Sequence, residues 1–237
     1  AGTQALLREG VVPVLVEGPL DALAITTTSD GHHLGLAPLG TSLTEEQAHQ
    51  LASLAHEAGT SPVVAADADP AGQQATERAY WLLTQHALHP QGVTLQPGSD
   101  PADTLTRYGP DALRRTLEAS TPLAHHITAQ RLHRHTGLEA LRAAAAAVAA
   151  DRPEHWDNGT RQVADTTHIP LPVVRRELAK ALQERADNPR AVTEKQITAA
   201  TARPVPPPAP AAERPPRGAP APAPSSTVSA PDRGPSR

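Results

Sequence analysis

The sequence contains no cysteine, no methionine and no phenylalanine among its 237 residues. The lack of cysteine excludes disulfides and zinc sites built from thiolates. Without phenylalanine, a core must be assembled from Leu, Val, Ala and Ile, with Tyr80 and Trp81 as its large side chains. No apolar run approaches the length of a membrane span and no signal peptide is visible, so we expect a cytoplasmic chain with no membrane partner.

The sequence also lacks a large net charge, because its 21 basic and 25 acidic residues nearly balance and leave a net charge of −4. A chain with this balance is not a general polyanion binder, so a nucleic-acid contact requires a local patch or a separate partner. The chain starts at Ala1 and contains no methionine. We therefore expect it to be a piece of a longer product.

Short apolar runs alternate with helical patterns over the first 105 residues. The predicted strands cover residues 11–16, 34–37, 63–66 and 92–95. The predicted helices cover residues 3–9, 20–27, 45–58 and 73–83. Alternation of this kind predicts an α/β fold with a parallel sheet of about four strands, flanked by helices.

From Pro110 the pattern predicts helices only, and from about Thr201 the chain is rich in proline without hydrophobic periodicity. A segment of the second kind cannot bury enough apolar surface to fold, so we expect it to be disordered. The predicted organisation is a sheet domain at 1–109, an all-helical subdomain at 110–186 and a proline-rich disordered tail at 187–237.

The segment Val63–Gly72 combines a buried strand with two aspartates, Asp67 and Asp69, followed by a helix. Two like charges this close are costly unless a cation joins them, and hard divalent ions prefer oxygen ligands. The alternative is that the Asp-x-Asp-Pro pattern only caps the following helix.

Acidic residues follow other predicted strands as well: Glu17 follows the first, and Asp100 and Asp103 follow the last. Because parallel strands end at one edge of the sheet, these carboxylates are expected to converge there. Convergent oxygens favour Mg²⁺ or Mn²⁺ over zinc, although His125, His126, His133 and His135 lie near one another in sequence. Small residues in the loops let a phosphate group approach the backbone closely. The predicted phosphate-binding residues are Gly18, Gly40, Thr41 and Gly72.

Four segments resemble, in order and spacing, the motifs of the Toprim domain found in DnaG-type bacterial primases. They are VEGPLDAL at 16–23, LGTSLT at 39–44, DADPAG at 67–72 and GSDPADTL at 98–105. The similarity is closest over residues 11–105 and weaker through the helices to about Arg185.

This resemblance implies a magnesium-dependent RNA polymerase that synthesises RNA primers on single-stranded DNA from ribonucleoside triphosphates during DNA replication. It implies Glu17, Asp67 and Asp69 as catalytic residues. The implied metal ligands are Glu17, Asp21, Asp67, Asp69, Asp100 and Asp103. A replicative helicase is a further implied partner. The family often has an acid where this chain has Ala102.

The chain departs from that family in lacking a Cys-rich zinc module and a basic subdomain ahead of the Toprim part. Two other functions therefore stay open. One is a Toprim nuclease, which uses the same acids to attach water. The other is a recruitment module that binds nucleic acid or a helicase without catalysis. Tyr80 and Tyr108 are interpreted as packing residues rather than topoisomerase nucleophiles.

Overall fold

The computed structural model describes residues 2–38, 42–66 and 69–201. The predicted tail beyond residue 201 lies outside the described residues, as do Gly40, Thr41 and Asp67. The described residues form one compact unit. None of the described helices is both long and apolar enough to cross a membrane.

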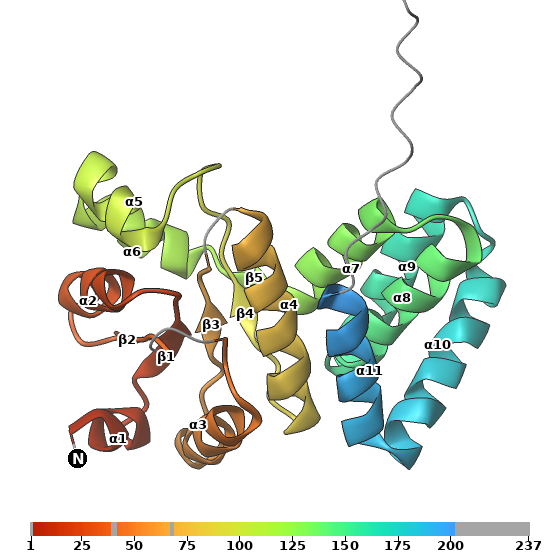
Figure 1. The fold of residues 1–237 in the computed structure, drawn as a ribbon, viewed down its shortest axis with the longest axis horizontal. Coiled ribbons are helices and arrows are strands. Elements are labelled where there is room, and N and C mark those ends of the chain that lie inside the picture. Colours follow the sequence, from red (N-terminus) through yellow and green to blue (C-terminus); the bar gives the residue numbers. More distant parts are fainter. Residues whose placement is uncertain (1, 39–41, 67–68, 202–237) are drawn as a thin grey trace, which may run out of the picture. The chain divides into compact units, whose positions relative to one another are not determined.

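A sheet of five strands occupies the first part of the chain (Figure 1). The strands are β1 (Val12–Leu15), β2 (His33–Leu36), β3 (Val63–Val64), β4 (Gln91–Gly92) and β5 (Thr121–Pro122). Their order is β2-β1-β3-β4-β5, with the first four parallel and β5 antiparallel to β4. The predicted parallel sheet of four strands is confirmed, and an antiparallel edge strand is added to it.

Alternate residues of the strands point to opposite faces of the sheet, and helices cover both faces. Val14 and Val63 pack in one apolar cluster with residues of α2 (Pro19–Thr28) and α6 (Pro110–Glu118), and α5 (Pro101–Tyr108) joins this layer. Leu15 and Val64 pack in a second cluster on the other face. That cluster includes residues of α1 (Gly2–Arg8), α3 (Glu45–Ala58) and α4 (Pro70–Gln85). The sheet is therefore buried on both faces, as parallel sheets are.

Local signals explain where several of these helices begin and end. The Thr44 side chain accepts a hydrogen bond from the Gln47 N–H, and the Gln47 Oε1 accepts one from the Thr44 N–H, an arrangement known as a capping box. Gly59 ends the same helix with a φ of 67°, a left-handed conformation that suits glycine. Thr44 and Gly59 therefore fix the limits of α3.

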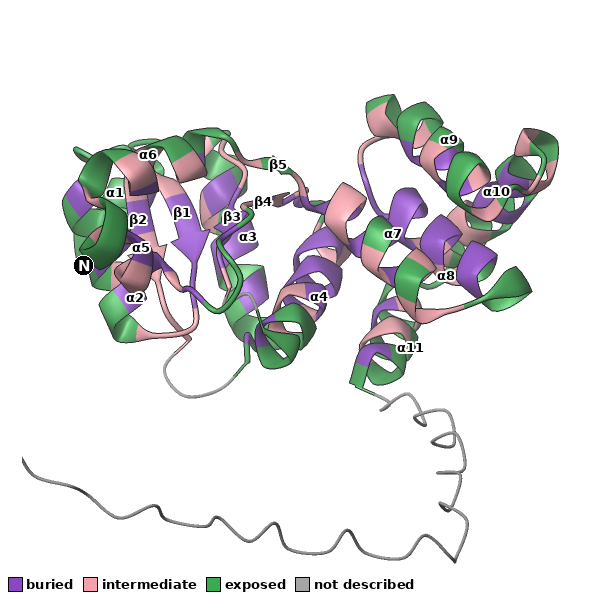
Figure 2. Cartoon of the chain, turned by 90° about the horizontal axis from the view of Figure 1, so that it is seen from above, coloured by how far each residue is buried: buried purple, intermediate pink, exposed green. Residues whose placement is uncertain are grey.

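The remaining helices follow the sheet. They are α7 (Leu123–Arg134), α8 (Gly137–Ala149), the short 3₁₀ helix η1 (Pro153–His155), α9 (Trp156–Thr167), α10 (Leu171–Asp187) and α11 (Pro189–Thr201). Much of α4 is buried between the sheet and these helices (Figure 2). The all-helical part is confirmed.

Two boundaries differ from the prediction. Residues 110–122 belong with the sheet, because Leu113 and Leu117 of α6 pack on it and β5 pairs with β4. The helix-only part therefore begins at α7. At the other end, α11 occupies residues 189–201, which we had assigned to the disordered tail. Ala200 is buried and Ile197 packs partly buried against the core, so packing stabilises a helix of weak intrinsic pattern.

Candidate active site

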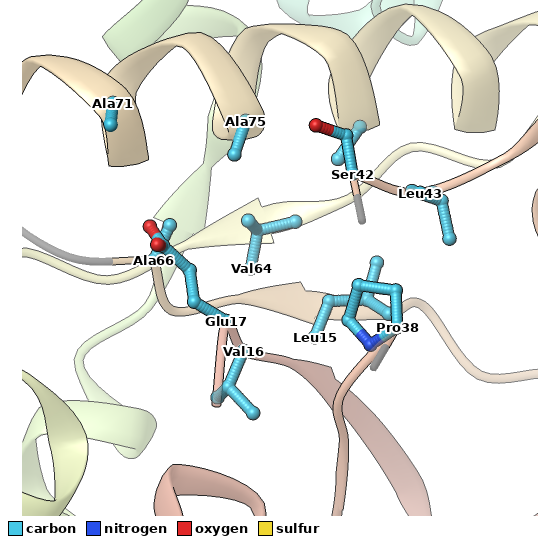
Figure 3. Close-up of a pocket in the computed structure, with 11 residues that line it drawn as sticks. Leu15, Val16, Glu17, Pro38, Ser42, Leu43, Val64, Ala66, Ala71 and Ala75 are labelled. Atoms are coloured by element: carbon cyan, nitrogen blue, oxygen red, sulfur yellow. The ribbon is translucent and has the colours of Figure 1, made fainter. Parts of the chain in front are cut away.

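A pocket of about 370 Å³ lies at the carboxyl ends of β1 and β3, beside Glu17 (Figure 3). Ala71, Ala75 and Ala79, which are spaced one helical turn apart on α4, form one wall. The other lining residues are Leu15, Val16, Pro38, Ser42, Leu43, Val64 and Ala66. The small side chains of α4 leave this space open, and the alanine spacing is a signal that reading the sequence had missed.

Glu17 directly follows β1 and is half-buried at this pocket. Asp69 stands at the start of α4, where its Oδ1 accepts a hydrogen bond of 2.7 Å from the Gly72 N–H. The helix-capping role that we had weighed for this motif is therefore present at Asp69. A second carboxylate oxygen is still available for a ligand, so capping and metal binding are compatible at this residue.

Asp21 and Asp100 come from motifs nearly eighty residues apart, and the fold brings them together. Asp21 is 7% exposed in the first turn of α2. Its oxygens accept hydrogen bonds from the Gly18 N–H at 3.2 Å and from the Ala102 N–H at 3.1 Å. Burial raises the pKa of Asp21, and the nearby Asp100 carboxylate raises it further, against the opposing backbone hydrogen bonds. This pair is a centre of negative charge, in which Asp21 comes from α2 and was named only through the family resemblance.

Asp103 faces another partner. Its carboxylate forms a 2.9 Å ion pair with Arg107 one turn later, and its N–H caps onto Asp100 Oδ1 at 2.5 Å. Asp100 is therefore the N-cap of α5, a helix that was not among the predicted elements. The role of Asp103 as a metal ligand stays a prediction.

The predicted phosphate-contacting residues are partly described. The Gly18 N–H is donated to Asp21 and the Gly72 N–H to Asp69, so both support the acids beside them. A Cβ at Gly18 would lie 2.9 Å from Asp21 Oδ2, which explains why a glycine stands there. Gly40 and Thr41 lie outside the described residues.

The metal ligand set stays a prediction as a whole. Within residues 2–38, 42–66 and 69–201, no three His, Asp or Glu side chains gather closely enough to hold an ion. Asp67, a central member of the predicted set, is outside those ranges. The donor chemistry of the acids at this edge fits magnesium, since all of them offer carboxylate oxygens and hard cations prefer oxygen.

The histidines considered for zinc point to separate partners. His126 Nε2 lies 2.8 Å from Thr121 Oγ1, whereas His135 pairs with Glu139. His125 packs near the ring of His155.

Comparison with known proteins agrees with the motifs. A family model described as Toprim-like matches residues 14–105. DNA primase of Halalkalibacterium halodurans is 34% identical over 111 residues, which are 47% of this chain and 18% of that protein. DNA primase of Treponema pallidum is 31% identical over 134 residues, 56% of this chain and 21% of the relative. The chain thus spans about a fifth of the length of these relatives.

Solved primase structures share the fold. The RNA polymerase domain of Mycobacterium tuberculosis primase DnaG is 25% identical, with a TM-score of 0.56, over 68% of this chain and 53% of that one. The Aquifex aeolicus primase, solved with its zinc-binding and RNA polymerase domains, is 24% identical with a TM-score of 0.54. That match covers 72% of this chain and 41% of the other. Residues 14–105 are therefore similar to the Toprim-like family, and the chain resembles DnaG-type DNA primases in sequence and fold.

Proposed function

We propose that this chain is part of a DNA primase, a nucleotidyltransferase that synthesises RNA primers on single-stranded DNA with Mg²⁺ or Mn²⁺. The observation that carries the proposal is the meeting of Asp21 and Asp100 at the edge where Glu17 and Asp69 also stand. Among the described residues, no Lys, Arg or His forms an ion pair with Asp21 or Asp100. Two acids this close, with no ion pair from the described residues, suit a divalent cation.

In this proposal Glu17, Asp67 and Asp69 are the catalytic residues. They would hold magnesium together with Asp21 and Asp100. The chemistry supplied by a bound ion is neutralisation of the triphosphate and acidification of the attacking 3′-hydroxyl. Glu17 would either ligate the ion or accept the hydroxyl proton, since it stands at the mouth of the pocket. Asp103 stays a predicted ligand as well, and its carboxylate also pairs with Arg107.

The pocket beside Glu17 gives the substrate a place. Its walls are mostly apolar, with the Glu17 carboxylate and the Ser42 hydroxyl as polar groups (Figure 3). An apolar slot next to acidic residues excludes water from one side of a bound nucleotide and strengthens charge interactions there. The proposed substrates are ribonucleoside triphosphates.

The proposed template is single-stranded DNA. One solved neighbour of the fold is a DnaG primase catalytic domain bound to ssDNA, at 20% identity and a TM-score of 0.52. A helicase partner and a cytoplasmic location stay predictions from the family resemblance.

The first test separates metal binding from capping. Asp69→Asn keeps a good N-cap, so thermal stability with EDTA should match wild type, whereas the stabilisation by magnesium should fall. Glu17→Gln should behave alike, with an affinity loss of at least about tenfold. The control is Asp111→Asn, an exposed aspartate paired with Arg114. If magnesium stabilises all of these proteins equally, the ligand assignments are wrong.

The second test separates synthesis from cleavage. Wild type and the same variants are incubated with labelled ribonucleotides and single-stranded DNA, or with labelled DNA alone. Template-dependent incorporation that is lost in Glu17→Gln and Asp69→Asn supports a primase. Metal-dependent cleavage of the labelled DNA without incorporation would replace it by a Toprim nuclease. Magnesium-independent DNA binding with neither activity would favour a recruitment module.

A further inference from the structure

A buried carboxylate in α4 links the Toprim-like part to the helices that follow it. Glu77 is 1% exposed. Its Oε1 accepts hydrogen bonds from Arg131, from Nε at 2.7 Å and from Nη2 at 2.5 Å, and its Oε2 accepts one from Arg134 Nη1 at 3.0 Å. Both arginines belong to α7. A charge buried this deeply is tolerated only while its partners stay in place, so the bonds hold α4 and α7 in one register.

Arg131 extends the link to two more helices. It is 3% exposed, and its Nη1 donates to the Ala143 carbonyl of α8 at 3.2 Å and to Gln196 Oε1 of α11 at 2.5 Å. Its guanidinium also stacks on Trp81 of α4, 4.7 Å from the ring centroid. One arginine thus joins α4, α7, α8 and α11 around the Glu77 carboxylate, and Figure 1 shows these helices side by side.

A further bond reaches the first turn of α4. Gln130 Nε2 of α7 donates to Gln73 Oε1 at 3.0 Å. Gln73 follows Gly72, whose N–H is donated to Asp69. The first turn of α4, with Asp69 as its cap, is therefore tied to α7 by the bond between Gln130 and Gln73.

We propose that Glu77 is a positioning residue, which fixes α4 through Arg131 and Arg134 so that Asp69 is presented at the sheet edge. This inference rests on the proposed function for the role of Asp69, although its structural part does not. The helices that follow the sheet would then influence the position of Asp69, because α4 is stiff over the two turns that separate Glu77 from Asp69. Groups that orient metal ligands from outside typically alter metal affinity by about 10- to 100-fold.

The chain offers a matched control. Glu177 of α10 is also buried, at 8% exposure, and is also paired with two cations. Its oxygens lie 2.6 Å from Lys180 Nζ and 3.6 Å from Arg142 Nε, and the latter pair joins α10 to α8. Glu177→Gln therefore loses the same kind of interaction as Glu77→Gln, but without a direct bond to α4.

The experiment compares Glu77→Gln with Glu177→Gln by two measurements. Hydrogen exchange reports the Gly72 amide, whose bond to Asp69 is the feature to be positioned, and calorimetric titration reports the Mg²⁺ dissociation constant. We expect Gly72 exchange to rise and magnesium affinity to fall about tenfold in Glu77→Gln only. Equal changes in both variants, after correction for global stability, would reduce Glu77 to a purely structural residue.

If Glu77→Gln does not fold, Gln130→Ala replaces it, since this change removes only the exposed bond to Gln73. Faster Gly72 exchange with unchanged melting supports positioning by α7, and unchanged exchange overturns it. If wild type binds no magnesium, the proposed function fails. The Gly72 exchange rates still decide whether Glu77 positions the start of α4.

Discussion

At the scale of single residues, the acidic pair of Asp21 and Asp100 makes a prediction of its own. Burial is the main reason why the pKa of Asp21 is raised, and Asp100 adds to it by repulsion and by a hydrogen bond. Asp100→Asn removes the repulsion but keeps the cap on α5, because asparagine caps helices as well as aspartate does. We expect the pKa of Asp21 to move down toward its ordinary value without reaching it.

The measurement is a titration of the Asp21 carboxyl carbon by NMR without divalent ions. Asp103→Asn is the control, because its carboxylate pairs with Arg107 rather than with Asp21. If Asp103→Asn lowers the pKa of Asp21 as much as Asp100→Asn does, the two acids act through a general field and not as a pair.

The positions of the acidic residues could be predicted from the sequence, whereas the contacts between them could not. The motif positions alone placed Glu17, Asp69 and Asp100 at strand ends or helix starts, and the structure has them there. The bond from the Ala102 N–H to Asp21 was beyond prediction, because it depends on how α5 lies against α2. Residues so far apart in sequence carry no local pattern that reports their distance.

At the scale of elements, the contact between β2 and α2 depends on a missing side chain. A Cβ at Gly35 would lie 2.2 Å from the Ala22 carbonyl oxygen and 2.4 Å from its Cα. Gly35→Ala must therefore push α2 away from the sheet, and such overpacking costs about 1–3 kcal/mol. The free energy of unfolding from urea titration checks this, with Gly2→Ala as the control, since a Cβ there meets nothing within 4 Å. Equal stability of the two variants would show that α2 tolerates the shift.

Elements with strong local signals were predictable, and those defined by packing were not. The capping residues of α3 and the apolar run of β1 are visible in the sequence. In contrast, β5 has only two residues, one of them Pro122, and exists because β4 offers it an edge. Likewise, α11 has little apolar periodicity and gains its stability from contacts, including the hydrogen bond that Arg131 donates to Gln196 Oε1.

At the scale of the whole molecule, the helical part packs against the Toprim-like part through polar as well as apolar contacts. Tyr80 of α4 donates a 2.6 Å hydrogen bond to the Ala147 carbonyl of α8, and Arg152 bonds Ser61 near the start of β3. Buried polar contacts of this kind are favourable only in one arrangement, because each group left without its partner costs free energy. The Toprim-like part and the helices after it are therefore expected to unfold as one cooperative unit.

Half-buried histidines across this unit make its stability depend on pH. Burial lowers the pKa of His33, His86, His89 and His126 below the ordinary value of 6.5. The unfolded chain therefore binds more protons than the folded one as the pH falls through about 6.5. The stability contributed by neutral imidazoles is present above that pH and is lost as the pH falls toward the lowered pKa values. Asp21 works in the opposite sense, because its raised pKa means that the folded state takes up a proton first.

We expect the free energy of unfolding to fall between pH 7.5 and pH 5.5, because the histidines resist protonation in the folded state. Urea titrations at pH 7.5, 6.5 and 5.5 measure it directly. His126→Gln should flatten the dependence, since glutamine bears no titrating proton and can still bond Thr121, the present partner of His126. The exposed His133 provides the control, and His133→Gln should leave the slope unchanged. An equal slope in wild type and His126→Gln would mean that the pH dependence of stability arises from other groups. An imidazole that resists protonation in the folded state lowers stability as the pH falls, so its removal must reduce the slope.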